Sequence, residues 1–161
     1  MQLYIRTLID ISRATTGYQL HMEDIDLPAY VEQLRGQVAA LCQTKKIGLQ
    51  IEIESLPAVL SADKLLMERA IMNVVNNALD YSPQGSHISI LIAGDKRSLK
   101  ISVTDAGPGF SQEDLLHAEE QFYMADRSRS SNLHFGMGLF ITKSIVRQHG
   151  GQLILSNSEK T

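Results

Sequence analysis

Apolar residues recur at helical spacing near the start of the chain. In residues 1–15, Tyr4, Leu8 and Ile11 form one stripe, and Gly17 follows it. A short helix of this kind needs a partner to bury its stripe, so we interpret it as the end of a longer helix that packs against another. A second helix is predicted over about 28–42, with apolar residues on one side (Val31, Leu34, Val38 and Leu41).

The next helical stretch has the strongest pattern in the sequence. Asp63 is a good N-cap, and Pro83 ends the helix near Asp80. Two rows of apolar residues step by four, which predicts a buried face: Leu66, Ala70, Val74 and Ala78, then Met67, Ile71, Val75 and Leu79. A last helix is predicted over 137–149, closed by Gly150-Gly151.

Alternation of apolar and polar residues predicts the strands. Apolar and polar residues alternate over 48–54. Apolar residues also occupy every second position in two later segments that a turn at 94–97 separates, first Ile88, Ile90 and Ile92, then Leu99, Ile101 and Val103. Shorter strands are predicted at 24–27, 59–60 and 153–155. Mixed helices and strands with a prominent hairpin indicate an α/β protein, a two-layer sandwich with a mixed sheet. The polar stretch from Phe110 to Phe135 has little pattern, as is typical of functional or mobile connections.

Composition narrows the class without naming a function. The chain has 161 residues, 43% hydrophobic and 20% charged, enough for one domain with a core. A net charge of −3 gives no indication of a nucleic-acid partner. Cys42 is the single cysteine and is interpreted as a packing residue, and no apolar run reaches the roughly 20 residues that span a bilayer.

Three polar residues share one face of the helix that follows Asp63. Asn73, Asn77 and Tyr81 are spaced by four, so they form a row. Asparagine is a poor residue inside a helix, but its carboxamide oxygen can bind Mg²⁺ and its NH₂ group can donate to phosphate. A solvated helix face is the alternative interpretation.

Two glycine motifs are candidates for nucleotide contacts. Asp105-Ala106-Gly107-Pro108-Gly109 follows a predicted strand, where glycine lets backbone approach a flat ligand and the aspartate can accept from an amine. Gly136-Met137-Gly138-Leu139 opens the last helix, whose first N–H groups suit phosphate. An ordinary turn and a flexible joint are the alternatives, and the sequence lacks G-x-x-x-x-G-K-[ST].

Taken together, these motifs resemble the catalytic domain of bacterial two-component sensor histidine kinases, of the GHKL ATPase superfamily. Residues 73–83 resemble the family's N box, Asp105-x-Gly107-x-Gly109 its first glycine box, and Gln121-Phe122-Tyr123 its F box. Gly136-x-Gly138-Leu139, with Lys143–Val146 and His149-Gly150-Gly151, resembles the second glycine box and its helix. The resemblance covers about 22–157 and implies a Bergerat-type fold.

The resemblance also implies a role for each residue toward ATP and Mg²⁺. Asn77 would hold the metal, and Asn73 would assist at the metal or phosphates. Tyr81 would lie against adenine, and Asp105 would accept a hydrogen bond from the adenine amino group. Gly107 and Gly109 would permit close approach, and residues 110–135 would form a lid over ATP. Phosphate contacts would come from Gly136, Gly138, Leu139 and two lid cations, Arg127 and Arg129.

The sequence departs from the family at three positions. Asp80 stands where a cation is common, and it would repel ATP unless it turns away or helps to bind the metal. Met124 and His134 replace a common arginine and a common glycine. Because the chain ends at Thr161, the closing strand of the family is expected to be missing, which predicts an open sheet edge and reduced stability.

The implied activity is transfer of the γ-phosphoryl group of Mg-ATP to a histidine outside this chain, for relay to an aspartate of a response regulator. Residues 1–16 would be the end of the dimerisation and phosphoacceptor hairpin of a homodimeric kinase, and 17–161 the ATP-binding catalytic domain. None of the five histidines has the expected helical context with a following acidic residue. The domain is expected to be cytoplasmic, in a membrane-anchored sensor.

Three alternatives stay open at this point. A hydrolytic ATPase of the superfamily would carry a general-base glutamate where this chain has Asn73, which cannot take a proton from water. A degenerate module that binds partners without kinase activity would explain Asp80, Met124 and His134. A serine kinase of the anti-sigma-factor type fits less well, because such kinases lack the N-terminal hairpin.

Overall fold

The structure is a computed structural model that describes residues 19–95, 98–117 and 138–157. Its strands are β1 (Glu23–Asp26), β2 (Gly48–Ser55), β3 (Val59–Ala62), β4 (His87–Gly94) and β5 (Leu99–Thr104). Its helices are α2 (Leu27–Lys45), α3 (Lys64–Tyr81), α4 (Gln112–His117) and α5 (Gly138–Gln148). The predicted helix at 1–15 lies outside the described residues.

The main sheet is mixed, as predicted. Its order is β2-β4-β5, with β2 parallel and β5 antiparallel to β4. The register aligns apolar side chains across the sheet, because Ile90 of β4 is opposite Ile51 of β2 and Val103 of β5. A separate two-stranded ladder joins β1 and β3.

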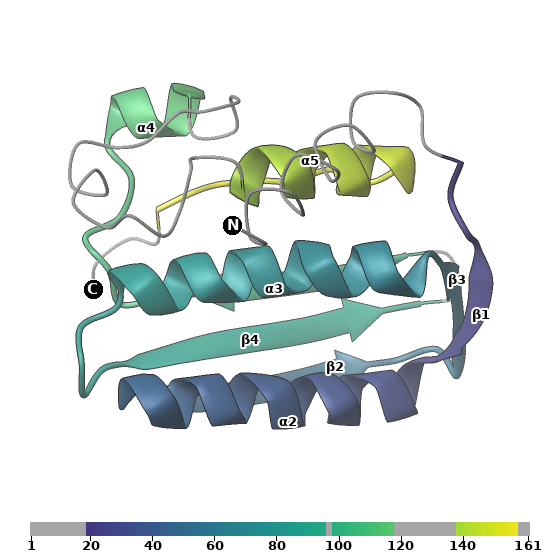
Figure 1. The fold of residues 1–161 in the computed structure, drawn as a ribbon, viewed down its shortest axis with the longest axis horizontal. Coiled ribbons are helices and arrows are strands. Elements are labelled where there is room, and N and C mark those ends of the chain that lie inside the picture. The colour runs from purple at the N-terminus through teal and green to yellow at the C-terminus, as the bar shows by residue number, and fades with distance from the viewer. Residues whose placement is uncertain (1–18, 96–97, 118–137, 158–161) are drawn as a thin grey trace, which may run out of the picture.

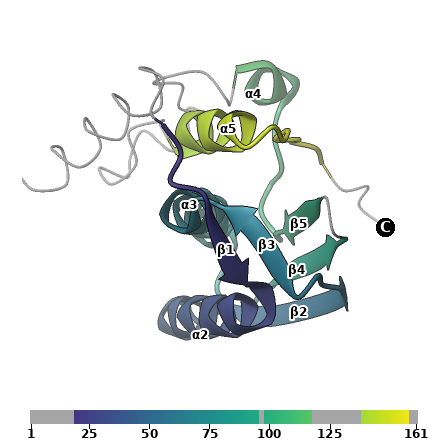
Figure 2. The same cartoon turned by 90° about the vertical axis from the view of Figure 1, so that its right-hand side faces the viewer.

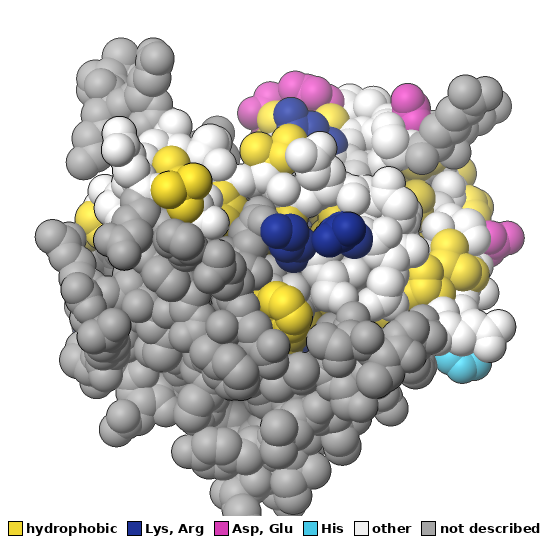
Figure 3. Space-filling model, turned by 90° about the horizontal axis from the view of Figure 1, so that it is seen from above, with side chains coloured by type: hydrophobic (Ala, Val, Ile, Leu, Met, Phe, Trp, Pro, Cys, Tyr) yellow, Lys and Arg dark blue, Asp and Glu magenta, His cyan; other side chains and the backbone are white. Residues whose placement is uncertain are grey.

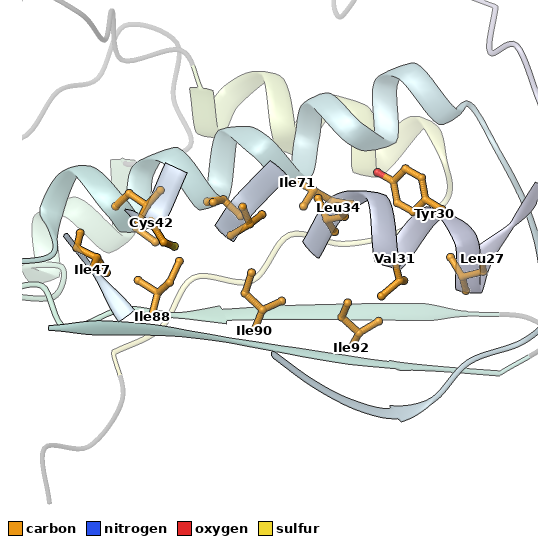
Figure 4. Packing of buried hydrophobic residues seen from close by; sticks show 14 of the residues in the cluster. Leu27, Tyr30, Val31, Leu34, Cys42, Ile47, Ile71, Ile88, Ile90 and Ile92 are labelled. Atoms are coloured by element: carbon orange, nitrogen blue, oxygen red, sulfur yellow. The ribbon is translucent and has the colours of Figure 1, made fainter. Parts of the chain in front are cut away.

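Helices α2 and α3 cover one face of this sheet (Figures 1 and 2). Ile88, Ile90 and Ile92 of β4 are at most 1% exposed and point toward the helices (Figure 4). The apolar rows of α3 supply Ile71, Val75, Ala78 and Leu79 to the same core. The predicted buried face of α3 and the two-layer architecture are therefore confirmed.

Helix α5 packs against α3 on the side away from α2 (Figure 2). Ala70 of α3 forms a second, smaller core with Ile141 and Ile145 of α5, and Leu66 and Phe140 pack against it. The rigid body that links α5 to the sheet is thus α3. Any ligand held between α3 and α5 would be positioned by this contact.

Local signals set the helix ends as the sequence predicts. The Asp63 carboxylate accepts from the backbone N–H of Leu66 at 3.1 Å and caps α3. Gly150 ends α5 with φ +75°, and the Gly151 N–H donates to the Val146 carbonyl at 2.8 Å.

Two expectations near the chain's second half were wrong. Residues 153–155 are not in a strand, because the described residues give them no ladder partner, and Ile154 is 74% exposed. Helix α4 lies inside the stretch 110–135 that was expected to lack regular structure. Within the described residues β5 pairs with β4 alone, so its other edge is open; reduced stability stays a prediction.

Candidate functional site

Helix α3 presents the three polar residues of the predicted row. Its apolar rows face the cores, which leaves Asn73 and Asn77 half-buried and Tyr81 36% exposed. Consecutive members of the row are about 6 Å apart along the axis, from the helical rise of about 1.5 Å per residue. The row therefore spans the second half of α3.

The C-terminal end of this row meets the first glycine motif. A Cβ atom on Gly107 would lie 3.1 Å from the Tyr81 carbonyl oxygen and 3.2 Å from the Tyr81 Cβ. The Gly107 N–H donates to Oδ1 of Asp105 at 2.7 Å, which folds the turn after β5. Since that bond uses one carboxylate oxygen, the other keeps its capacity to accept from a ligand.

The N-terminal end of the row meets the second glycine motif. Asn73 Nδ2 donates to the Gly138 carbonyl at 3.2 Å, and a Cβ on Gly138 would lie 3.9 Å from the Asn73 side chain. The Thr142 hydroxyl donates to the same carbonyl at 2.8 Å and accepts from Asn73 Nδ2 at 3.4 Å. Thr142 is only 2% exposed, so this small network is buried between α3 and α5.

Asn77 lies between these two contacts. Its carboxamide makes no hydrogen bond within 19–95, 98–117 and 138–157, although its neighbours in the row are both engaged. A half-buried amide without an internal partner is available to a ligand. The structure thus brings Asn73, Asn77, Tyr81, Asp105, Gly107 and Gly138 to one side of α3.

Asp80 turns away from this row. Its carboxylate forms an ion pair with the Lys45 ammonium, in the last turn of α2. Because the Lys45 ammonium neutralises the Asp80 carboxylate locally, the expected repulsion between Asp80 and the phosphates of ATP is weakened. Of the outcomes considered for this position, the structure shows the carboxylate directed toward α2.

Gly109 has a second requirement besides access for a ligand. Its φ is +77°, a conformation that favours glycine, and a Cβ there would lie 2.9 Å from Oδ1 of Asn157. The open side of Gly109 is therefore filled by a side chain from the end of the described chain.

The first turn of α5 can offer N–H groups to an anion. Gly138 begins this 11-residue helix and Leu139 is half-buried behind it. Lys143 and Arg147 follow on α5 one turn apart. Basic side chains gather on the face that carries α5 (Figure 3), so this face holds positive charge although the net charge of the chain is −3.

Several predicted residues lie outside the described part of the chain. These are the lid cations Arg127 and Arg129, the first glycine of the second motif, Gly136, and the substituted positions Met124 and His134. Their roles stay predictions.

A metal would need ligand oxygens beyond those of carboxylates. Among the described residues, no group of three or more His, Cys, Asp or Glu side chains could hold an ion. The Asn77 carboxamide suits Mg²⁺, which keeps water and phosphate oxygens as most of its ligands.

No helix in the described ranges is both long enough and apolar enough to span a membrane.

Three residues at or near the site were not predicted from the sequence. Thr142 could have been noticed as a polar position in the apolar face of the last helix, four residues after Gly138. Lys45 and Asn157 gave no sequence signal, because their partners Asp80 and Phe110 are 35 and 47 residues away along the chain.

The chain is similar to known histidine kinases in sequence and in fold. Sensor histidine kinase SpaK of Bacillus subtilis is 35% identical over 158 residues, which is 98% of this chain and 34% of SpaK. The catalytic domain of histidine kinase ThkA superposes with a TM-score of 0.74 at 18% identity, covering 87% of this chain and 90% of that one. Full-length ShkA in complex with AMPPNP gives a TM-score of 0.74 at 20% identity, covering 91% and 30%.

The match to a protein family covers most of the candidate site. The chain spans about a third of the length of SpaK, so it corresponds to one part of such a protein. The sequence model of the histidine kinase-, DNA gyrase B- and HSP90-like ATPases matches residues 62–161, more than half of the chain and all of α3 and α5. The chain belongs to this family of ATPases.

Proposed function

We propose that this chain binds Mg-ATP along α3 and is the catalytic part of a sensor histidine kinase. The observation that carries the proposal is the row on α3, which contacts the first glycine motif through Tyr81 and the second through Asn73. A nucleotide is an elongated ligand with a flat base at one end and anions at the other. The row has an aromatic side chain and the first glycine motif at one end, and helix N–H groups and the second glycine motif at the other. These two ends suit the base and the phosphates of such a ligand.

The residues at the Tyr81 end would hold the base. Tyr81 offers an aromatic ring that is partly exposed, and the second oxygen of Asp105 would accept a hydrogen bond from the adenine amino group. Gly107 keeps the backbone close to α3 and leaves room beside it. The complex of ShkA with AMPPNP, an ATP analogue, supports a nucleotide in a protein of this fold.

The residues at the Asn73 end would hold the phosphates. The N–H groups at the start of α5, at Gly138 and Leu139, would bind phosphate oxygens, and Asn77 would be a ligand of Mg²⁺. Bound Mg²⁺ would neutralise charge on the phosphates during transfer. Asn73 fixes the start of α5 through the Gly138 carbonyl, so it positions these N–H groups.

The phosphoryl acceptor is proposed to be a histidine on a helical hairpin outside this chain, in a homodimeric kinase. The phosphoryl group would then pass to an aspartate of a cognate response regulator. The 35% identity to SpaK, named a sensor histidine kinase, supports this assignment. The domain is proposed to lie in the cytoplasm as part of a membrane-anchored sensor.

Hydrolysis of ATP by this chain is expected to be slow. At the position of the superfamily's general base, Asn73 donates its amide hydrogen to Gly138 and Thr142. An amide used in this way cannot accept a proton from water. Rapid, steady release of phosphate from the purified chain would favour the ATPase alternative.

Calorimetric titration with Mg-ATP tests the binding step. The Asn77→Ala variant is expected to lose about tenfold or more in affinity, as for a hydrogen-bonding or metal-binding group worth roughly 1.5–3 kcal/mol. Its thermal stability should change little, because the Asn77 side chain has no partner among the described residues. Asn76→Ala, one residue away on α3, is the matched control and should bind normally.

Two results would contradict this proposal. One is no detectable binding of millimolar Mg-ATP by the unmodified chain, which would favour a degenerate module. The other is equal loss of affinity in both variants. The transfer step is tested separately by restoring a complete phosphoacceptor hairpin and looking for acid-labile phosphohistidine from labelled ATP.

A further inference from the structure

The end of the described chain is fastened beside the first glycine motif. Oδ1 of Asn157 accepts from the Phe110 N–H at 2.8 Å, and Nδ2 of Asn157 donates to the Phe110 carbonyl at 2.8 Å. One side chain therefore satisfies both backbone groups of one residue, as a neighbouring strand would. It does so where residues 151–157 form no strand of their own.

The same carboxamide explains the glycine that precedes Phe110. At Gly109, φ is +77° and any Cβ would lie 2.9 Å from the Asn157 Oδ1, closer than real Cβ contacts allow. Gly109 and Asn157 thus fit together, and a side chain on Gly109 would displace the amide. This contact is independent of any ligand.

The turn from Asp105 to Phe110 is consequently held at both ends. Its first half is fixed by the Asp105–Gly107 hydrogen bond and by the contact of Gly107 with Tyr81 on α3. Its second half has, in the described residues, the Asn157 amide as its hydrogen-bonding partner. Without Asn157, the segment after Gly107 would lose the pair of hydrogen bonds that holds Phe110.

We infer that Asn157 is a positioning residue for the base-binding end of the site. By fastening Phe110 it sets the path of the turn that carries Asp105, and so the direction of the Asp105 oxygen toward a purine amino group. This inference rests on the proposed function. A tether of the chain end alone would affect stability but not the choice of base.

The test compares ATP with inosine triphosphate, which carries a carbonyl oxygen in place of the adenine amino group. The unmodified 161-residue chain should prefer Mg-ATP by about tenfold or more, because the carboxylate of Asp105 faces an acceptor in the other nucleotide. In Asn157→Ala this preference should narrow to about threefold or less, with ATP affinity falling by about three- to tenfold. Gln152→Ala removes an exposed amide from the same segment and should leave the preference unchanged.

Backbone amide resonances of the free chain give a readout that needs no nucleotide. The Gly107 and Gly109 signals should move in Asn157→Ala and stay in place in Gln152→Ala. An unmodified preference for ATP in Asn157→Ala, or unmoved glycine signals, would overturn the role of Asn157. If the unmodified chain binds both nucleotides equally while the glycine signals still move, the assignment of Asp105 to the base fails instead.

A double substitution checks the link to Gly109. Gly109→Ala should weaken ATP binding in the unmodified background, through the strained φ and the collision with Asn157. In the Asn157→Ala background the collision is gone, so the additional loss should be smaller. Additive losses would show that the two residues act separately and would contradict the inference.

Discussion

Asp80 shows how a single residue can mislead when only its type is known. A carboxylate at a position where the family commonly has a cation would be expected to repel ATP, yet in the structure it pairs with Lys45 from another helix. The sequence could not reveal this partner, because contact between α2 and α3 is a property of the fold. The charge at position 80 must therefore be judged together with that at position 45.

Removal of the Lys45 charge should weaken ATP binding. Lys45→Ala removes the positive charge beside the Asp80 carboxylate. One unit charge near another is worth about 1 kcal/mol at the dielectric constant of water, so the affinity for ATP should fall by up to about fivefold. The loss should shrink in high salt, which screens the charge. Calorimetry of Lys45→Ala at two salt concentrations measures it.

The matched control carries a second substitution. Asp80→Asn added to Lys45→Ala removes the exposed carboxylate, so ATP affinity should return to that of the unmodified chain. Stability should change little in either variant, since both side chains are partly exposed. An equal loss of affinity in the single and double variants would show that Lys45 acts on nucleotide by some other route.

At the scale of elements, sequence pattern predicted those structures that local chemistry decides. The caps at Asp63 and Gly150 and the buried rows of α3 follow from neighbouring residues, and all are present. The segment 153–155 has a strand's composition but no ladder, because a strand depends on a partner elsewhere in the chain. The contacts of Asn157 and Lys45 were missed for the same reason.

Asp63 also connects three segments that the sequence does not bring together. Beyond capping α3, its Oδ2 accepts from the His21 N–H at 3.0 Å, and its own N–H donates to Nε2 of His149 at 3.1 Å. Nδ1 of His149 in turn lies 2.8 Å from the Ile145 carbonyl, to which it donates. The start of α3 is thereby joined to the chain before β1 and to the end of α5.

Loss of this carboxylate should cost more than loss of an ordinary cap. Asp63→Ala removes two acceptors at a site that is 4% exposed, so the free energy of unfolding should fall by about 2–3 kcal/mol. Asp26→Ala is the comparison, because Asp26 caps α2 through one exposed bond to the Ala29 N–H and should cost about 1 kcal/mol. Urea unfolding curves of both variants measure the two free energies of unfolding. Equal decreases in the two variants would contradict a role of Asp63 in joining the three segments.

For the whole molecule, the question is whether the layers unfold together. One continuous core joins α2, α3 and the sheet, while α5 attaches through its own smaller cluster on α3. Sequence pattern predicted both layers, and it placed the candidate row and a buried face on the same helix, α3. Because α3 belongs to both, nucleotide bound on one side of α3 should stabilise the packing of α2 on the other.

Cys42 reports on that coupling from within α2. It is 2% exposed, and burial raises the pKa of its thiol, so opening of the core favours both access to Cys42 and formation of the reactive thiolate. If opening is global, Mg-ATP at 100 times its Kd should slow modification of Cys42 by about 100-fold, since ligand stabilises the folded state by RT ln(1 + [L]/Kd). The rate of reaction with a thiol reagent, with and without Mg-ATP, measures this. At the same Mg-ATP concentration Asn77→Ala, which binds about tenfold more weakly, should be protected only about tenfold. If saturating Mg-ATP leaves the rate of Cys42 modification unchanged, α2 opens separately from α3, and the two layers are not one cooperative unit.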